Sequence, residues 1–259
     1  MAYRNPAFVA RHFMAEAGVS AITSSATLAG QGVERLIDYR LAANMKFSTT
    51  ATGLFVEVDF GADQSLDRLI IPAGHNMAGA NLRVFANDTS PANGGGSIFV
   101  HNEASAGAGL LDFSWATVTK RYWRFISPTS GQWEFGELWF GQRQQTSTGP
   151  RIGWELPLFT PAVVRSFATR EAVAIAGPSR RRMNLEHAAL SGTDLAIYDE
   201  VLALGVALPF YAYAPDDTLA DPILMRLVED GGRTQDHPIP KATAGPSYTV
   251  RLRALEQKS

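Results

Sequence analysis

The stretch Leu54-Phe55-Val56-Glu57-Val58-Asp59-Phe60 places an apolar side chain at every second position. A period of two residues is typical of a β-strand with one buried face. Further apolar segments follow in the first half of the chain, at residues 69–71, 82–86, 97–101, 110–115, 121–126 and 137–140. Turn-forming Gly, Pro, Asn and Asp residues lie between several of them. The first half is therefore predicted to be a β-sandwich.

The pattern changes after a polar segment that ends in Gly149-Pro150. Beyond it, strands are predicted at residues 152–158, 162–167, 223–228 and 248–252, and one amphipathic helix at residues 194–204. Thr193 or Ser191 can cap the start of this helix, and Gly205 follows its end. The sequence predicts a mostly β protein with two domains: a sandwich over residues 1–145 and an α+β domain with one main helix over residues 146–259.

The composition excludes several classes of function. The chain has 259 residues, 23 basic and 25 acidic side chains, and no cysteine. A net charge of −2 leaves no basic field over a whole domain, so nucleic acid is not an expected partner. Without cysteine there are no disulfides, thiolate metal sites or cysteine nucleophiles. No apolar run approaches the roughly 18 residues of a membrane span, and no export signal is recognised, so membrane insertion is not expected.

Four of the five tryptophans, Trp115, Trp123, Trp133 and Trp139, fall within a segment of 25 residues. Aromatic side chains favour half-buried strands, so most of these rings are expected in the core of the sandwich. Trp133 follows Ser130-Gly131-Gln132 in a predicted turn. An aromatic ring at the tip of a loop is predicted to contact a ligand or a partner.

No catalytic or nucleotide-binding motif is present. The chain lacks Walker A, complete GxGxxG, HExxH and GxSxG sequences, and its five histidines are scattered. The protein is therefore not expected to be an enzyme. One alternative stays open, a glycosidase that uses two carboxylates brought together by folding. Its candidate carboxylates are Asp194, Asp199, Glu200 and Asp216.

The single run of like charges is Arg180-Arg181-Arg182. Three roles remain open for it: contact with phosphates, pairing with carboxylates of a neighbouring subunit, or a solvated turn. The flat net charge argues against phosphates. Together with apolar Phe210 and Tyr211, the three arginines are the candidate assembly interface.

The ordered segments of the first half resemble the discoidin, or F5/8 type C, family over residues 30–141. The matching segments are Leu36-Ile37-Asp38, Val56-Glu57-Val58-Asp59-Phe60-Gly61, Arg121-Tyr122-Trp123-Arg124 and Gly136-Glu137-Leu138. This resemblance implies a jelly-roll sandwich of the galactose-binding-like type, which binds ligands, often sugars, through loops at one end. It implies binding and not catalysis.

The resemblance also implies site residues. A structural calcium ion would map to Asp38 and Glu137, although Tyr39-Arg40 stands where the family usually has a glycine and a second acidic residue. No other cofactor is expected. The ligand-binding candidates in predicted loops are Arg40, Asn44, His75, Asn76 and Trp133.

Residues 150–259 do not fit that family, and their order of features resembles tail-tip proteins of long-tailed bacteriophages. The two resemblances together predict a phage tail protein, made in the host cytoplasm and located in the virion. Its expected partners are other tail proteins in a symmetric multi-copy assembly and a glycan of the host surface. The alternative is a free-standing carbohydrate-binding module protein of a glycan-degrading system.

Overall fold

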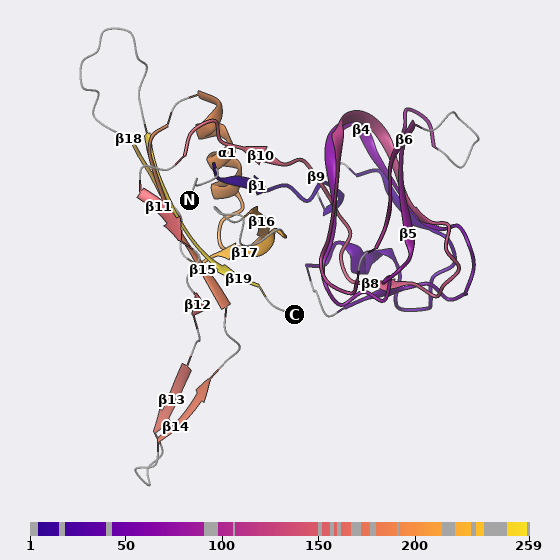
Figure 1. The fold of residues 1–259 in the computed structure, drawn as a ribbon, viewed down its shortest axis with the longest axis horizontal. Coiled ribbons are helices and arrows are strands. Elements are labelled where there is room, and N and C mark those ends of the chain that lie inside the picture. Colours follow the sequence, from indigo (N-terminus) through magenta and orange to yellow (C-terminus); the bar gives the residue numbers. More distant parts are fainter. Residues whose placement is uncertain are drawn as a thin grey trace. The chain divides into compact units, whose positions relative to one another are not determined.

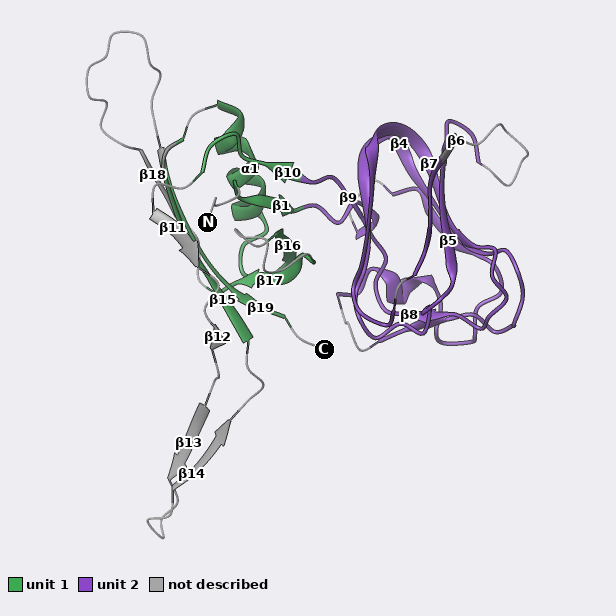
Figure 2. Ribbon diagram, viewed as in Figure 1, with its two compact units in different colours: residues 1–10, 144–258 green, residues 11–143, 259 purple. Residues whose placement is uncertain are grey.

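The computed structural model divides the chain into two compact units (Figures 1 and 2). Unit 1 comprises Met1–Ala10 and Gln144–Lys258, and unit 2 comprises Arg11–Arg143. The structure describes residues 5–15, 19–39, 43–90, 98–105, 107–149, 152–155, 158–159, 162–166, 172–176, 180–190, 192–213, 221–228, 232–235 and 248–257.

Unit 2 is inserted into unit 1. Strand β1 (Ala7–Val9) pairs with β10 (Gln144–Gln145) on one side and with β16 (Pro209–Tyr213) on the other. The chain therefore leaves unit 1 after β1 and returns to it at β10. The predicted boundary after residue 145 lies close to the observed one, but the assignment of the first ten residues to the sandwich is wrong. A strand of three residues has no detectable period, and its partners lie far away in the sequence.

Unit 2 is an antiparallel sandwich built on two long strands, β4 (Leu54–Ile71) and β7 (Leu111–Ser127). The sheet order is β2-β4-β7-β5-β6, with β9 also pairing with β4. The pairing of the long strands shifts register between Asp59 and Gln64, and both strands curl over in this region (Figure 1). The remaining elements are β2 (Ala21–Ser24), β3 (Met45–Lys46), β5 (Asn81–Asn87), β6 (Ile98–Ala104), β8 (Glu134–Phe135), β9 (Trp139–Gly141) and the short 3-10 helices Phe13–Ala15 and Val33–Leu36.

One core fills the sandwich. The alternation in the quoted stretch is confirmed, because Val56 and Val58 are completely buried and Glu57 points to the other face of β4. Trp123 and Trp139 are also completely buried, as predicted for core tryptophans. The jelly-roll β-sandwich predicted for this part of the chain is thus the observed fold class.

Unit 1 is an α+β unit, as predicted, with a sheet in the order β10-β1-β16-β17-β19-β15-β11. Helix α1 (Gly192–Ala203) packs on one face of this sheet, where the ring of Tyr198 lies 5.8 Å from that of Phe8. Strand β12 pairs with β15, β18 pairs with β19, and β13 and β14 form a separate hairpin. The bounds are β11 (Ile152–Glu155), β12 (Leu158–Phe159), β13 (Ala162–Ser166), β14 (Ala172–Ala176), β15 (Arg180–Leu190), β17 (Ile223–Leu227), β18 (Gly232–Gln235) and β19 (Tyr248–Glu256). None of the helices in the described part of the chain is long and apolar enough to cross a membrane.

The end of α1 depends on Gly205, whose φ of +57° lies in the left-handed region. Its N–H donates to the Leu202 carbonyl at 3.0 Å, which closes the last turn. We expect Gly205→Ala to lower the free energy of unfolding by about 1 kcal/mol, because a Cβ disfavours this conformation. Urea denaturation measures the change. Gly109→Ala is the control, since it has open space and no positive φ, and an equal loss in both variants would contradict the assignment.

Candidate ligand-binding site at the β8 end of the sandwich

The short pairing of β3 with β8 brings three polar side chains together at one end of unit 2. Lys46 lies opposite Glu134 in this register. The Asn44 Nδ2 donates to Glu134 Oε1 at 2.9 Å, and the Lys46 Nζ lies 3.3 Å from Glu134 Oε2. The carboxylate is thus held from both sides.

Asn76 joins the same cluster from the loop after β4. Its Nδ2 donates to the Gln132 carbonyl at 3.0 Å, and its Oδ1 accepts from the Glu134 N–H at 2.7 Å. Its own N–H donates to the Glu134 carbonyl at 3.1 Å. Asn76 therefore fixes the backbone of β8 at the position where Glu134 presents its side chain.

The cluster retains hydrogen-bonding capacity toward solvent. The side chains of Lys46 and Glu134 are 32% and 33% exposed. Beyond the contacts just described, the Lys46 ammonium has further N–H groups, and the Asn44 amide has an acceptor oxygen and a second N–H. The hydrogen bond from Asn44, with the nearby Lys46, lowers the pKa of Glu134, so its carboxylate is charged near neutral pH. Such a fixed set of donors and acceptors suits a ligand rich in hydroxyl groups.

His75 directly precedes Asn76 of this cluster in the sequence, but the His75 side chain is buried. Its Nδ1 accepts from the Met77 N–H at 3.2 Å, which leaves Nε2 as the donor to the Gly109 carbonyl at 2.7 Å. Burial lowers the pKa of His75, so the ring is neutral near pH 7. The structure thus uses both ring nitrogens to hold loops together rather than to present them to a ligand.

Trp133 was predicted to contact a ligand or a partner from the tip of a loop, but its side chain is only 8% exposed. The indole packs into the core, and its N–H donates to the Thr129 carbonyl at 3.3 Å. A Cβ built on Gly131 would lie 2.4 Å from the ring. The glycine two residues earlier was the available signal, since only glycine lets the backbone pass so close over an inward-facing indole. Arg40, the remaining ligand candidate, lies outside the described residues.

The two calcium residues implied by the family resemblance, Asp38 and Glu137, have different surroundings in the structure. Asp38 pairs with Arg35 at 3.6 Å, and Glu137 is completely buried. Within the described parts of the chain, no group of three His, Cys, Asp or Glu side chains could hold an ion. Asp38 and Glu137 therefore lack a third side chain of these types beside them among the described residues.

The candidate assembly residues of unit 1 divide into two groups. Phe210 and Tyr211 are completely buried, so they cannot serve as the predicted docking surface. The three arginines begin strand β15 instead of forming a turn. The Arg181 N–H donates to Glu256 Oε2 at 2.7 Å, whereas Arg182 is exposed. An apolar run in a sequence has the same appearance whether it faces a core or a partner.

The carboxylates of the glycosidase alternative have different surroundings. Asp194 is 7% exposed and accepts hydrogen bonds from the backbone and hydroxyl groups of Ser147 and Thr148. Asp199 and Glu200 lie on the half-exposed side of α1. Asp216 lies outside the described residues.

No protein-family model and no curated protein matches this chain. Among solved structures, the CBM32 and M60 catalytic domains of ZmpB from Clostridium perfringens align at 19% identity and a TM-score of 0.44, over 52% of this chain and 14% of that one. The CBM32 of AlyQ, in complex with 4,5-unsaturated mannuronic acid, aligns at 20% identity and a TM-score of 0.40. This alignment covers 47% of this chain and 94% of that one. Chitosan-binding module 1 of a chitosanase/glucanase from Paenibacillus sp. IK-5 aligns at 16% identity and a TM-score of 0.42. This alignment covers 50% of this chain and 98% of that one. Each alignment thus covers about half of this chain, and the first spans a small part of the larger protein.

Proposed function

We propose that unit 2 is a glycan-recognition module that binds a saccharide at the β8 end, and that unit 1 is the scaffold that carries it. The observation that carries the proposal is the cluster of Asn44, Lys46, Asn76 and Glu134. Its side chains are oriented by one another before any ligand arrives, which lowers the entropic cost of binding. The resemblance of the sequence to the discoidin family supports the same type of ligand.

The charges of the cluster favour a neutral ligand. Glu134 and Lys46 form an ion pair at 3.3 Å, so together they add no net charge. A paired carboxylate and ammonium with two amides can donate to and accept from vicinal hydroxyl groups. We therefore propose a neutral, hydroxyl-rich sugar, bound weakly at one site and more strongly when several copies act together.

The setting that we propose is the tail of a long-tailed bacteriophage. The support is the sequence resemblance of residues 150–259 and the architecture, in which an inserted module is held through both of its ends by a second unit. Mass spectrometry of purified phage particles from cultures of the source organism tests this setting. Absence from every particle would favour the alternative of a free-standing carbohydrate-binding protein.

Glycan binding at the cluster predicts that Glu134→Ala and Asn44→Ala each weaken affinity about tenfold, the effect of losing roughly 1.4 kcal/mol of binding free energy. A glycan array with the full-length protein identifies the ligand, and calorimetry then compares the variants. Arg83→Ala is the matched control, because its side chain lies on β5 and contacts Asn102. Wild-type affinity in both cluster variants, with a folded circular dichroism spectrum, would remove the site from the proposal.

A further inference from the structure

The segment at residues 26–31 runs alongside β3 and is joined to it through the backbone of Lys46. The Leu28 N–H donates to the Lys46 carbonyl at 2.8 Å, and the Lys46 N–H donates to the Gln31 carbonyl at 3.1 Å. The Lys46 side chain belongs to the cluster for which we propose saccharide binding. The segment therefore has a fixed position next to that cluster.

Leu28 begins a tight turn within this segment. The Gln31 N–H donates to the Leu28 carbonyl at 2.9 Å, which closes the turn. Gly30, at the third position of the turn, has a φ of +74°, which is the conformation that a type II turn requires there and that glycine adopts without strain. The turn thus presents Leu28 in one defined place before any ligand arrives.

The side chain of Leu28 lies on the same side of β3 as that of Lys46. Met45 and Phe47 are buried, whereas the Lys46 side chain between them is 32% exposed. Thr27 lies opposite Phe47 in an antiparallel bridge, so these two residues share the inner side. Successive side chains of extended backbone alternate, and Leu28 therefore belongs to the outer side.

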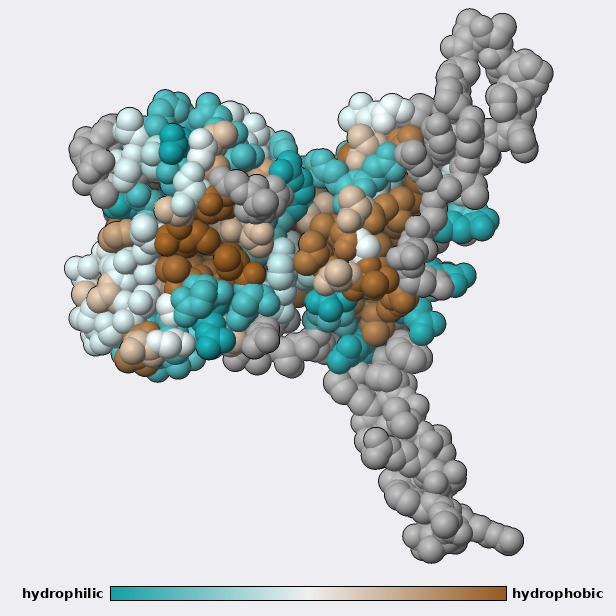
Figure 3. All heavy atoms as spheres, turned by 180° about the vertical axis from the view of Figure 1, so that it is seen from behind, coloured by the Kyte–Doolittle hydropathy of each residue, from teal (hydrophilic) through white to brown (hydrophobic). Residues whose placement is uncertain are grey.

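Leu28 is 40% exposed, and among the described residues of unit 2 it is the single large apolar residue in the exposed class. On the face of unit 2 that Figure 3 shows, hydrophobic residues gather between hydrophilic ones. One exposed leucine is ordinary in a protein surface, so its position carries the argument. Lys46 has Leu28 on one side and Glu134 on the other. Side chains adjacent across such pairings lie about 5 Å apart, within reach of one bound sugar.

We infer that Leu28 forms an apolar subsite of the cluster and selects neutral sugars that carry a methyl group. This inference rests on the saccharide binding proposed for the cluster. A hydroxyl group placed against Leu28 loses water without gaining a hydrogen bond, whereas a methyl group is favoured by leaving water. An N-acetyl group in place of a hydroxyl, or a 6-deoxy carbon, supplies such a methyl. Neither adds charge, which agrees with the ion pair of Lys46 and Glu134.

A glycan array with matched pairs tests the subsite on the full-length protein. The members of one set of pairs differ only by N-acetyl in place of hydroxyl, and those of the other set only by methyl in place of the C6 hydroxymethyl. The wild type is expected to bind the methyl-bearing member at least about fourfold more tightly, the effect of burying one methyl group. The set that shows this preference identifies the source of the methyl.

Calorimetry on a pair that binds then compares variants of Leu28. Leu28→Ser is expected to bring the affinity ratio of the two members close to one, while the hydroxyl member keeps its wild-type affinity. Leu28→Met keeps an apolar side chain of similar volume, so it should keep the preference. The matched control is Val206→Ser, at a residue of unit 1 that is 48% exposed, which should change neither affinity. Circular dichroism establishes that each variant is folded.

The failure of the subsite and the failure of the saccharide site give different results. If Glu134→Ala weakens binding of both members, but the wild type has no preference or folded Leu28→Ser retains it, the saccharide site stands and the subsite is overturned. If no glycan binds, or if Glu134→Ala binds both members like the wild type, the proposed site itself is wrong and the subsite falls with it.

Discussion

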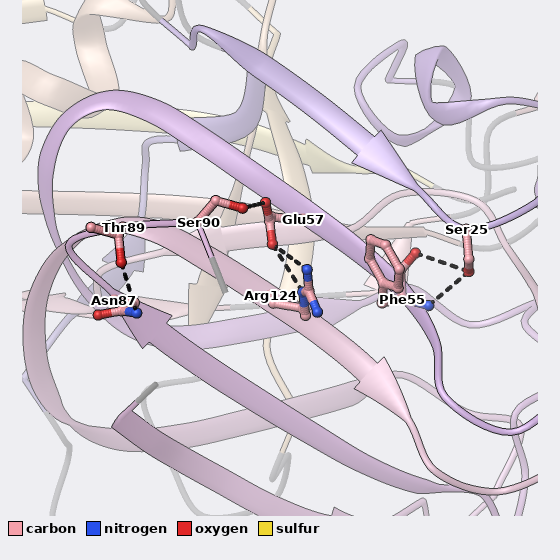
Figure 4. Close-up of polar contacts among 7 residues, drawn as sticks. All are labelled: Ser25, Phe55, Glu57, Asn87, Thr89, Ser90 and Arg124. Carbon is pink, nitrogen blue, oxygen red and sulfur yellow. Dashed lines mark hydrogen bonds and ion pairs between the residues drawn. The ribbon is translucent and has the colours of Figure 1, made fainter. Parts of the chain in front are cut away.

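Replacing Arg124 with methionine is expected to lower the free energy of unfolding of the sandwich by about 3 kcal/mol. Arg124 lies directly opposite Glu57 in the pairing of β4 with β7, and Glu57 is 8% exposed. The Arg124 Nε and Nη2 donate to Glu57 Oε2 at 2.9 and 2.6 Å, and Ser90 donates to Oε1 at 2.7 Å (Figure 4). Without the guanidinium, a nearly buried carboxylate loses its counter-charge.

The size of this effect reflects the loss of a partner more than the strength of the ion pair. The double variant Glu57→Leu/Arg124→Met removes both charges, so it should recover most of the lost stability. Urea denaturation followed by tryptophan fluorescence measures all three proteins. Arg83→Met on the neighbouring strand β5 is the control, expected within about 0.5 kcal/mol of the wild type. A single variant that loses less than about 1 kcal/mol, or a double variant as unstable as the single, would contradict this account.

Alternation predicted the strands of the sandwich well where one face is buried. The segments expected at residues 54–60 and 69–71 are parts of one strand, β4. The backbone continues through a shift of register, while Gly61, Ala62 and the polar residues 63–65 interrupt the period. Strand β15 was missed for a different reason. Its inward residues Met183 and Leu185 alternate with exposed ones, but the preceding run of arginines is typical of a turn or a charged surface.

The candidate site was predicted only in part. The loops that contain Asn44 and Asn76 do meet, but the residues that join them come from β3 and β8. These strands have two residues each, and no local pattern shows that Lys46 lies opposite Glu134. Whether a side chain such as Trp133 faces inward from a turn depends on the path of the backbone. Local sequence periodicity does not contain that information.

Removal of the Asp194 carboxylate is also expected to have a large effect on stability, in unit 1. This carboxylate accepts from the Ser147 N–H at 2.8 Å and Oγ at 2.9 Å, and from the Thr148 N–H at 3.3 Å and Oγ1 at 2.9 Å. These bonds tie the segment after β10 to the first turn of α1. We expect Asp194→Ala to lower the free energy of unfolding of unit 1 by about 2 kcal/mol, because several donors lose one charged acceptor.

The same carboxylate gives this effect a pH dependence. Burial alone would raise the pKa of Asp194, but the hydrogen bonds from Ser147 and Thr148 outweigh it and lower the pKa below the usual value. The unfolded chain therefore takes up the proton first as the pH falls. The stabilisation by Asp194 is complete above about pH 4 and is lost as the pH falls through the lowered folded pKa.

Hydrogen exchange of the full-length protein can follow the two units separately. At pH 7, Asp194→Ala should speed exchange in peptides from α1 and from the segment at residues 144–149, and leave peptides from β4 and β7 unchanged. Asp194→Asn is the conservative variant, because its side chain can still accept hydrogen bonds but carries no charge. Its stability should lie between that of the wild type and that of Asp194→Ala. Denaturation at decreasing pH should show the gap between wild type and Asp194→Asn closing below about pH 4. A gap that stays constant down to pH 2 would mean that the carboxylate holds this segment through its shape and not through its charge.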